Sequence, residues 1–306
     1  MERVIWNQKV SCYDLCSYYL SGILHLWTDI YNYSSAQLQP VASACYVAPK
    51  GMSAIAKFLG SDLDIYLNQL VEAITFVEPN HRLPLHWHLT LLTNNDSTLT
   101  TSELTAKAVV FAIRAPQALT LLQTLANIPT FLEQLSSVKF DPCLSVIAGY
   151  SEKLHQRPLW NAITFVEQCD LRWIGLDSSK RMETGQSLVF VLHSSADFAR
   201  QHLEAPDLQP IGQQMLTCAS ESLLPWLNDP EWMQVHRWRY AFPRSCLKTT
   251  YLATQTPLPL VCCGDWCGGD RIEAAINSGI AAAEQINSQL YGRSLPRDNF
   301  LHKFKH

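Results

Sequence analysis

Residues 260–286 read LVCCGDWCGGDRIEAAINSGIAAAEQI, and this stretch predicts three structures in succession. The apolar run Leu260–Cys263 is short and unbroken, which is typical of a buried strand. Gly264-Asp265 and the pair Gly268-Gly269 then indicate a turn. The residues after Arg271 predict a helix with an apolar stripe. That stripe comprises Ile272, Ile276, Gly279, Ala283, Ile286 and Leu290.

This strand-turn-helix corner has two interpretations. The start of a helix has free N–H groups and the positive end of the helix dipole. Gly268 and Gly269 place no side chain over that helix start, so an anionic ligand could lie against the backbone. Asp265, at the end of the strand, could accept hydrogen bonds from sugar-like hydroxyls. The alternative is a glycine turn with a helix cap and no ligand.

Composition and charge exclude several classes of protein. The chain has 306 residues, of which 47% are hydrophobic and 16% charged, and this suits one large domain or two ordinary ones. The net charge of -4 gives no basic field for nucleic acid. No apolar run approaches the ~18 residues of a membrane span. The ten cysteines lack the spacing of a zinc site, so we expect reduced, mostly buried thiols in the cytoplasm.

The rest of the chain predicts a mixed α/β protein. The run Ala108–Ile113 has no polar alternation and predicts a strand buried on both faces, as in a parallel sheet. Residues 32–40 are polar and predict a loop. We expect helices at 11–29, 53–60, 211–224 and after Pro116, and strands at 63–78, 86–95, 98–106, 138–152, 171–181, 187–195 and 234–245.

The segment GDWCGGDRIEAAINSGIAAA resembles the C-terminal flavin segment of the flavin amine oxidase superfamily, especially its renalase-like branch. YVAPKGMSAIAKFLG, LNQLVEAI, AKAVVFAIRAPQALTLL and HRWRYAFP resemble other parts of that family in the same order. The resemblance runs from about residue 13 to 290. It implies an incomplete FAD/NAD(P)-binding Rossmann-like domain plus an antiparallel-sheet substrate domain. It also implies FAD as cofactor and hydride transfer from an amine or a reduced nicotinamide-like substrate.

The resemblance also implies the residues of the site. The cofactor-binding candidates are Gly264, Asp265, Trp266, Arg271, Ile272, Glu273, Ala274 and Val71, the last through backbone near the adenine. For Trp266, packing in the core is the alternative. The substrate-side candidates are Trp238, Arg239 and Tyr240, for which cation–π packing on a plain sheet is the alternative. No catalytic base can be assigned.

Three further expectations concern side chains without an assigned role. His86 and His88 are interpreted as histidines on one face of a hairpin strand, and no metal site is expected. Lys180 and Arg181 are interpreted as a solvated turn. Ser278 has no His-Asp companions in a recognisable motif, so it gives no indication of a hydrolase.

The resemblance divides the chain into domains by residue range. It assigns 41–115 and 255–292 to the FAD-binding domain, 1–40 and 116–254 to the substrate domain, and 293–306 to a C-terminal tail.

The chain departs from the family at the motif that binds the pyrophosphate of the cofactor. The family begins with a βαβ unit carrying G-x-G-x-x-G, whose helix start holds that group. The 12 glycines of this chain include no G-x-G pair. Either the chain is a truncated relative that has lost FAD binding and acts as a non-catalytic ligand- or partner-binding remnant, or the missing part lies upstream of Met1. An exposed sheet edge is then expected to favour self-association or a partner chain.

Overall fold

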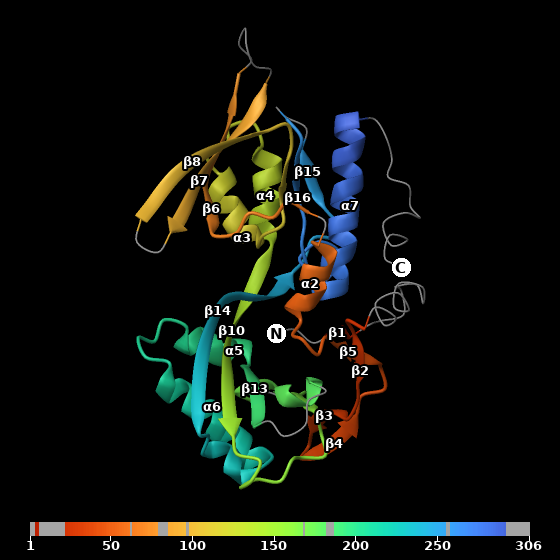
Figure 1. The fold of residues 1–306 in the computed structure, drawn as a ribbon, viewed down its shortest axis with the longest axis vertical. Coiled ribbons are helices and arrows are strands. Elements are labelled where there is room, and N and C mark those ends of the chain that lie inside the picture. The colour runs from red at the N-terminus through yellow and green to blue at the C-terminus, as the bar shows by residue number, and fades with distance from the viewer. Residues whose placement is uncertain are drawn as a thin grey trace. The chain divides into compact units, whose positions relative to one another are not determined.

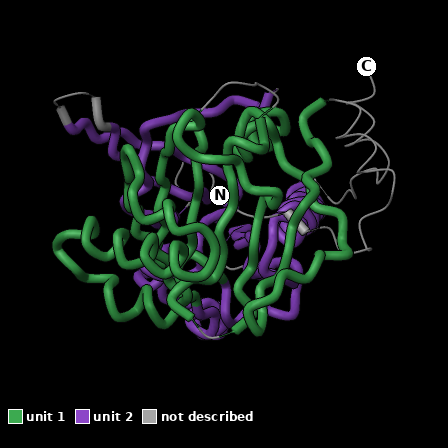
Figure 2. The backbone as a smooth tube through the Cα atoms, turned by 90° about the horizontal axis from the view of Figure 1, so that it is seen from below, with its two compact units in different colours: residues 1–59, 140–242 green, residues 60–139, 243–306 purple. Residues whose placement is uncertain are grey.

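The computed structural model describes residues 4–5, 22–61, 63–78, 85–95, 98–167, 169–181, 187–254 and 258–291. The chain divides into two compact units (Figures 1 and 2). Unit 1 comprises residues 1–59 and 140–242, and unit 2 comprises 60–139 and 243–306. The units differ from the predicted domains in three places, because 41–59 falls in unit 1, whereas 116–139 and 243–254 fall in unit 2. The expected tail, 293–306, lies outside the described residues.

Unit 1 contains a seven-stranded sheet with the order β14-β10-β13-β12-β11-β3-β4. β10, β13, β12 and β11 pair antiparallel in succession, whereas β11 and β3 are parallel. The strands are β3 (Ile30–Ser34), β4 (Gln37–Pro40), β10 (Lys139–Tyr150), β11 (Ala162–Phe165), β12 (Leu171–Leu176), β13 (Leu188–Ser194) and β14 (Trp232–Ser245). This is the largely antiparallel sheet that the sequence predicted for the substrate domain.

One face of this sheet packs against helices. Leu188, Phe190 and Leu192 alternate along β13 and are buried in the largest apolar core. Met215 and Leu216 bring α6 into the same core. The covering elements are α5 (Ala196–His202), α6 (Gln209–Ser222) and the short 3-10 helix η2 (Pro225–Asn228); a second 3-10 helix, η1 (Asp177–Lys180), follows β12.

The opposite face of the sheet contributes to a second core with residues of a small sheet, ordered β1-β5-β2. Its strands are β1 (Val4–Ile5), β2 (His25–Trp27) and β5 (Cys45–Val47), and α2 (Ser53–Leu59) follows, as predicted. The predicted helix ending near Asp29 is wrong over 25–27, because β2 pairs there with β5. Its earlier part lies outside the described residues. The predicted loop at 32–40 is also wrong: β3 and β4 form a hairpin, with Ser35 and Ala36 at positive φ in its turn.

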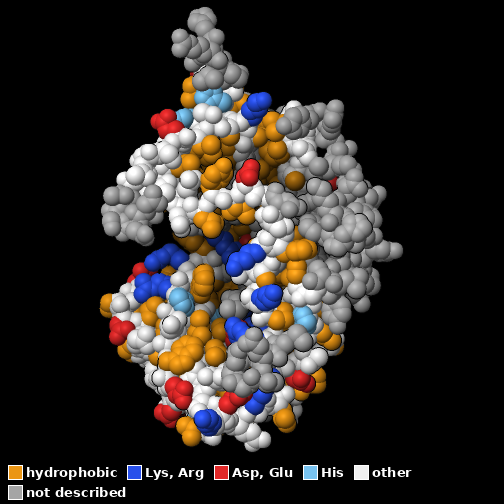
Figure 3. Space-filling model, viewed as in Figure 1, with side chains coloured by type: hydrophobic (Ala, Val, Ile, Leu, Met, Phe, Trp, Pro, Cys, Tyr) orange, Lys and Arg blue, Asp and Glu red, His pale blue; other side chains and the backbone are white. Residues whose placement is uncertain are grey.

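Unit 2 contains two three-stranded sheets, β15-β16-β9 and β6-β7-β8. Their strands are β15 (Leu252–Thr254), β16 (Leu260–Cys262), β9 (Val109–Phe111), β6 (Gln69–Val77), β7 (His86–Asn95) and β8 (Thr98–Ala106). The helices are α3 (Ala115–Leu122), α4 (Pro129–Ser137) and α7 (Ile272–Tyr291). Apolar side chains gather at the surface where β6–β8 run (Figures 1 and 3). Leu70, Leu99 and Leu104 of these strands are more than half exposed.

The strand predictions in unit 2 need two corrections. β9 pairs parallel with β16, which agrees with the expectation of a parallel sheet, but it lies at the edge of its sheet. Val110 is therefore 45% exposed, and burial of β9 on both faces is wrong. Residues 63–67 precede the strand, because β6 begins at Gln69 after Asn68, which has positive φ.

The helix predicted after the turn is present as α7, but its buried face is not the predicted stripe. Ser278 and Ala282 are buried, whereas Gly279 and Ala283 are exposed. A Cβ at Gly279 would meet nothing within 4 Å, so this glycine does not serve a close helix approach. The small polar Ser278 takes the buried place because it bonds the turn after β16. None of the described helices is long and apolar enough to cross a membrane.

Candidate functional site

The carboxyl ends of β9 and β16 lie side by side in unit 2. The two strands are parallel, with Val110 opposite Val261, and the Cys263 N–H donates to the Phe111 carbonyl at 3.0 Å. Residues that follow parallel neighbours emerge at one edge of the sheet, where ligands of open α/β sheets bind. Arg114 follows β9 and Asp265 follows β16. The Arg114 guanidinium forms an ion pair with the Asp265 carboxylate, and Asp265 is only 8% exposed.

The turn after β16 is fastened to the core on both sides. The Gly264 N–H donates to Ser278 Oγ on α7 at 2.9 Å, and Ser278 is fully buried. The Trp266 indole N–H donates to the Ile113 carbonyl at 3.1 Å. Trp266 is also fully buried, so its ring belongs to the core of unit 2 and presents no open face. Gly268 has φ +77°, a conformation that favours glycine.

The start of α7 combines the backbone N–H groups of a first helical turn with the Glu273 carboxylate, which has no partner on another described residue. Both carboxylate oxygens of Glu273 are buried and accept no hydrogen bond from another described residue. Burial raises the pKa of Glu273. A half-buried carboxyl group in the first turn of a 20-residue helix needs a polar partner, because an unsatisfied buried acceptor is costly. Arg271, just before the helix, is exposed and lies 3.8 Å from Asp270.

These features fit a bound flavin in part. The helix start, the glycine turn and Glu273 offer donors and an acceptor of the kind that polar cofactor groups use. Gly269 leaves no room for a side chain, since a Cβ there would lie 2.7 Å from the Ala274 Cβ. The Asp265 carboxylate already has Arg114 as its partner, so its free acceptor capacity is reduced. Arg114 and Ser278 are the site residues to which the sequence reasoning gave no role, although both lie in segments that resemble the family.

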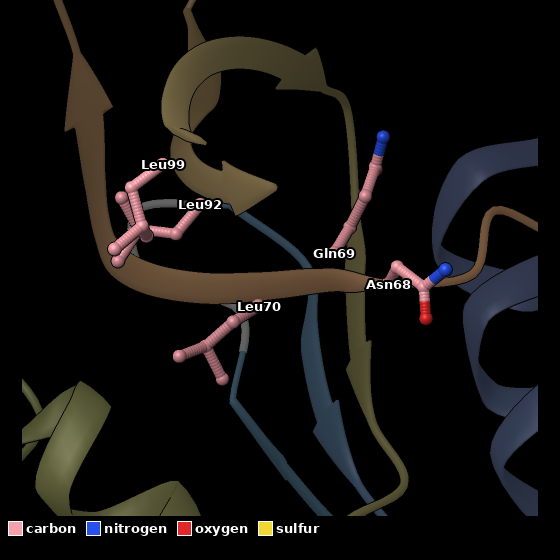
Figure 4. Close-up of a pocket in the computed structure, with 5 residues that line it drawn as sticks. All are labelled: Asn68, Gln69, Leu70, Leu92 and Leu99. Atoms are coloured by element: carbon pink, nitrogen blue, oxygen red, sulfur yellow. The ribbon is translucent and has the colours of Figure 1, made fainter. Parts of the chain in front are cut away.

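All eight predicted cofactor residues fall in unit 2. Val71 lies on β6 opposite Leu91, in the sheet that does not contain β16. The adjacent start of β6 borders a shallow hollow of about 390 Å³ (Figure 4). Leu70 of β6 is paired with Leu92 of β7. In Figure 4, Leu70 and Gln69 lie on opposite sides of β6. The hollow is lined by Asn68, Gln69, Leu70, Leu92 and Leu99.

The predicted substrate-side residues lie on β14, at the edge of the seven-stranded sheet, and the pleat separates them. Trp238 and Tyr240 are on one face and are 51% and 37% exposed. Arg239 is on the opposite face, where its guanidinium pairs with both Glu204 carboxylate oxygens. Phe242 continues the face of Trp238 and Tyr240.

A cationic side chain, that of Arg172, lies over the Phe242 ring. The Arg172 guanidinium lies 4.1 Å from the ring centroid, and Arg172 is exposed. Trp238, Tyr240, Phe242 and Arg172 are called the aromatic platform below. This contact joins Arg172 of β12 to Phe242 and is not the cation–π packing that was suggested for Arg239 with Trp238 and Tyr240.

A buried ion cluster follows β12 and was not predicted. Asp177 is 4% exposed, and its carboxylate binds Lys180 Nζ at 3.0 Å and Arg181 at 2.7 Å. The Lys180 ammonium also lies 5.0 Å from the Trp27 ring centroid and 5.7 Å from that of Trp173. The interpretation of Lys180 as part of a solvated turn is therefore wrong, since its side chain is only 9% exposed. Burial alone raises the pKa of Asp177, but the two cations outweigh it and hold that pKa below its usual value.

His193 lies beside this ion cluster. Its ring centroid is 5.1 Å from that of Trp173. Burial, helped by the charges of Lys180 and Arg172, lowers the pKa of His193 to about 3, so the imidazole is neutral at pH 7. The Trp173 indole N–H is buried and has no hydrogen-bond partner within the described part of the chain.

The two hairpin histidines lie on β7. His88 Nε2 is 3.3 Å from a Glu103 carboxylate oxygen on the neighbouring strand β8. Within the described ranges, no three His, Cys, Asp or Glu side chains gather in a way that could hold a metal ion.

Comparisons with known proteins place these observations in a family. Residues 12–287 match the model of the flavin containing amine oxidoreductases. The fold is similar to that of wild-type putrescine oxidase bound to putrescine, with a TM-score of 0.51 and 15% identity over 81% of this chain and 55% of that chain. A double mutant of putrescine oxidase gives a TM-score of 0.49 with the same identity and coverage. This chain thus spans 55% of the length of that structure. Because the family match covers most of its residues, the chain belongs to the flavin-containing amine oxidoreductase family.

Proposed function

We propose that the protein is an FAD-dependent oxidoreductase of the renalase-like type, which passes a hydride from its substrate to flavin. The observation that carries the proposal is the glycine turn at the carboxyl end of β16, which leads into the start of α7. Family membership supports the same assignment. A bound flavin would supply the hydride acceptor. The turn and the start of α7 would hold the flavin, and the positive helix end would favour the negative charge of its reduced form.

The aromatic platform supports a choice between the two expected substrate classes. Exposed Trp238 and Tyr240 offer ring faces on which a planar group can stack. Arg172 adds a cation at the same face, which repels an ammonium group and attracts a phosphate. We therefore propose a reduced nicotinamide-like substrate in preference to an amine. Putrescine, the ligand of the similar structure, would be the less suitable substrate for this chain.

The first experiment is an absorption spectrum of the purified chain with and without added FAD. A bound flavin that is bleached by a reduced nicotinamide, and not by putrescine, would support both parts of the proposal. Bleaching by the amine alone would refute the substrate choice and leave the flavin assignment intact. No bound flavin in excess FAD would refute the assignment and favour the alternative, a non-catalytic relative that binds a ligand or a partner chain.

A pair of variants locates the flavin on α7. Glu273→Ala removes the acceptor without a partner at the helix start, and the matched control Glu284→Ala removes a carboxylate about three turns along the same helix. We expect Glu273→Ala to weaken FAD binding about 10- to 150-fold, since a hydrogen bond to a charged group contributes roughly 1.5–3 kcal/mol. Glu284→Ala should leave the affinity unchanged. Equal affinities of the two variants would place the flavin elsewhere.

A further inference from the structure

A run of exposed apolar side chains leads into β6 in unit 2. Residues 63–71 read LDIYLNQLV and contain a single charged side chain, that of Asp64. Five large hydrophobic residues of this run are more than half exposed. Leu99 joins them, because it lines the hollow at the start of β6 together with Leu70 (Figure 4). These residues, called the apolar patch below, are Leu63, Ile65, Tyr66, Leu67, Leu70 and Leu99.

The area of the apolar patch is at the upper limit of what a monomer usually exposes. Six side chains of this size, each about two-thirds exposed, offer on the order of 600 Å² of apolar surface. The largest apolar patch on a typical monomer is about 300–600 Å². Two copies that meet through the apolar patch would bury roughly 1,200 Å², which is above the roughly 1,000 Å² that a specific interface needs. The area therefore suffices for a dimer of modest stability.

The apolar patch offers both exposed side chains and a hollow beside them, as a self-complementary surface requires. Tyr66 and Leu67 are 76% and 77% exposed, and the hollow of about 390 Å³ begins at the next residue. A twofold dimer uses the same surface on both copies, so a side chain of each copy meets the hollow of the other. Two amides, of Asn68 and Gln69, line the hollow (Figure 4). An amide both donates and accepts hydrogen bonds, so these residues suit contact with an identical surface.

We propose that the apolar patch is a dimer interface between two copies of this chain, in which Tyr66 of each copy enters the hollow at the start of β6 of the other. The tyrosine ring packs against Leu70 and Leu99, and its hydroxyl bonds the Asn68 or Gln69 amide. The contact forms twice in the dimer, because the two copies are equivalent. The dimer therefore closes on itself and covers the apolar patch of both copies.

Sedimentation velocity of the full chain over a range of micromolar concentrations tests the dimer. We expect the wild type to pass from monomer to dimer within that range. Leu99→Asp places a charge in the hollow and should raise the dissociation constant about 100-fold, since each dimer contains the substitution twice. Leu99 is 73% exposed, so this variant should keep the melting temperature of the wild type. The control Leu159→Asp changes a 93% exposed leucine of unit 1 and should leave the dissociation constant unchanged.

A mixing experiment tests the contact between Tyr66 and the hollow. Tyr66→Lys and Leu99→Asp should each be mostly monomeric alone. Mixed in equal amounts, they should form a heterodimer, because one contact keeps the original tyrosine and leucine and the other brings the new lysine to the new aspartate. Association through the edge of β9 uses the other sheet of unit 2, so Val110→Lys should lower the mass no further than that of the dimer.

The outcomes separate the interface from the detail of its contact. A wild type that stays monomeric, or equal dissociation constants for the wild type and Leu99→Asp, would overturn the interface and assign the apolar patch to a different partner. Variants that do not recover on mixing would overturn the contact of Tyr66 with the hollow.

Discussion

Removing the charge of Asp177 should destabilise unit 1 more than any surface charge of that unit. Asp177→Asn keeps the size of the side chain but takes away the anion that Lys180 and Arg181 share. The Lys180 side chain is 9% exposed, so its ammonium would remain in the core without a counter-charge. Arg181 is 38% exposed and can turn to water.

The expected magnitude follows from this difference in exposure. Breaking a buried ion pair by removing one partner costs about 3–5 kcal/mol. Because Arg181 is partly solvated and asparagine can still accept a hydrogen bond, we expect the lower end, about 3 kcal/mol in the free energy of unfolding. For a unit of this size that corresponds to a fall of about 6–12 °C in Tm.

Urea unfolding followed by circular dichroism and by tryptophan fluorescence measures the change. The control Asp197→Asn removes a 68% exposed partner of Arg200, and its loss should stay under about 1 kcal/mol. The double variant Asp177→Asn with Lys180→Met removes both charges and keeps the apolar stem on Trp27 and Trp173. It should recover most of the loss. A single variant within about 1 kcal/mol of wild type, or a double variant as unstable as the single one, would refute the reasoning.

Three further outcomes follow from the structure. The pKa of His193 is lower in the folded protein than its unfolded value of 6.5, so its neutral form contributes to stability in full above pH 6.5. That contribution falls by about 1.4 kcal/mol per pH unit toward pH 3, where it is lost. His193→Gln should therefore flatten the pH dependence of the urea-unfolding free energy over that range. Ser278→Ala leaves the partly buried Gly264 N–H without its acceptor, and calorimetry should show a loss of about 1 kcal/mol. We propose that the open edge of β9 favours self-association, so Val110→Lys should lower the mass seen by light scattering, whereas Leu159→Lys in an exposed loop should not.

Hydrophobic patterning predicted most of the strands and helices, because burial repeats along the chain. It predicted α2, α6, β13 and the presence of strand β9, although not that β9 pairs with β16. It failed at 25–40, where positive φ at three short side chains, Asp29, Ser35 and Ala36, turns the chain between strands. No local pattern distinguishes such a turn from a polar loop.

In the candidate site, too, residues that are contiguous in sequence could be predicted, whereas contacts between residues far apart in sequence could not. The glycine turn and the start of α7 are contiguous in sequence, so the motif could reveal them. Arg114 and Asp265 are 151 positions apart and meet only because β9 and β16 pair in parallel. Lys180 was misassigned because charged residues close together in sequence, here Asp177, Lys180 and Arg181, are typical of a surface turn. The Lys180 ammonium instead lies over the ring of Trp27, 153 positions earlier. A single sequence contains no record of such contacts.

The arrangement in unit 2 separates the residues that hold the turn from those that are available to a ligand. Asp265, Trp266 and Ser278 each have a partner inside the unit, and each bond fixes the backbone between β16 and α7. Glu273, by contrast, has two buried oxygens without a described partner. We propose that this carboxyl group distinguishes a ligand site from a structural corner, because a bond from its own backbone N–H leaves further acceptor capacity for a ligand. If FAD raises the Tm of wild type but not of Glu273→Ala, the ligand interpretation holds; equal shifts would reduce the turn to a structural one.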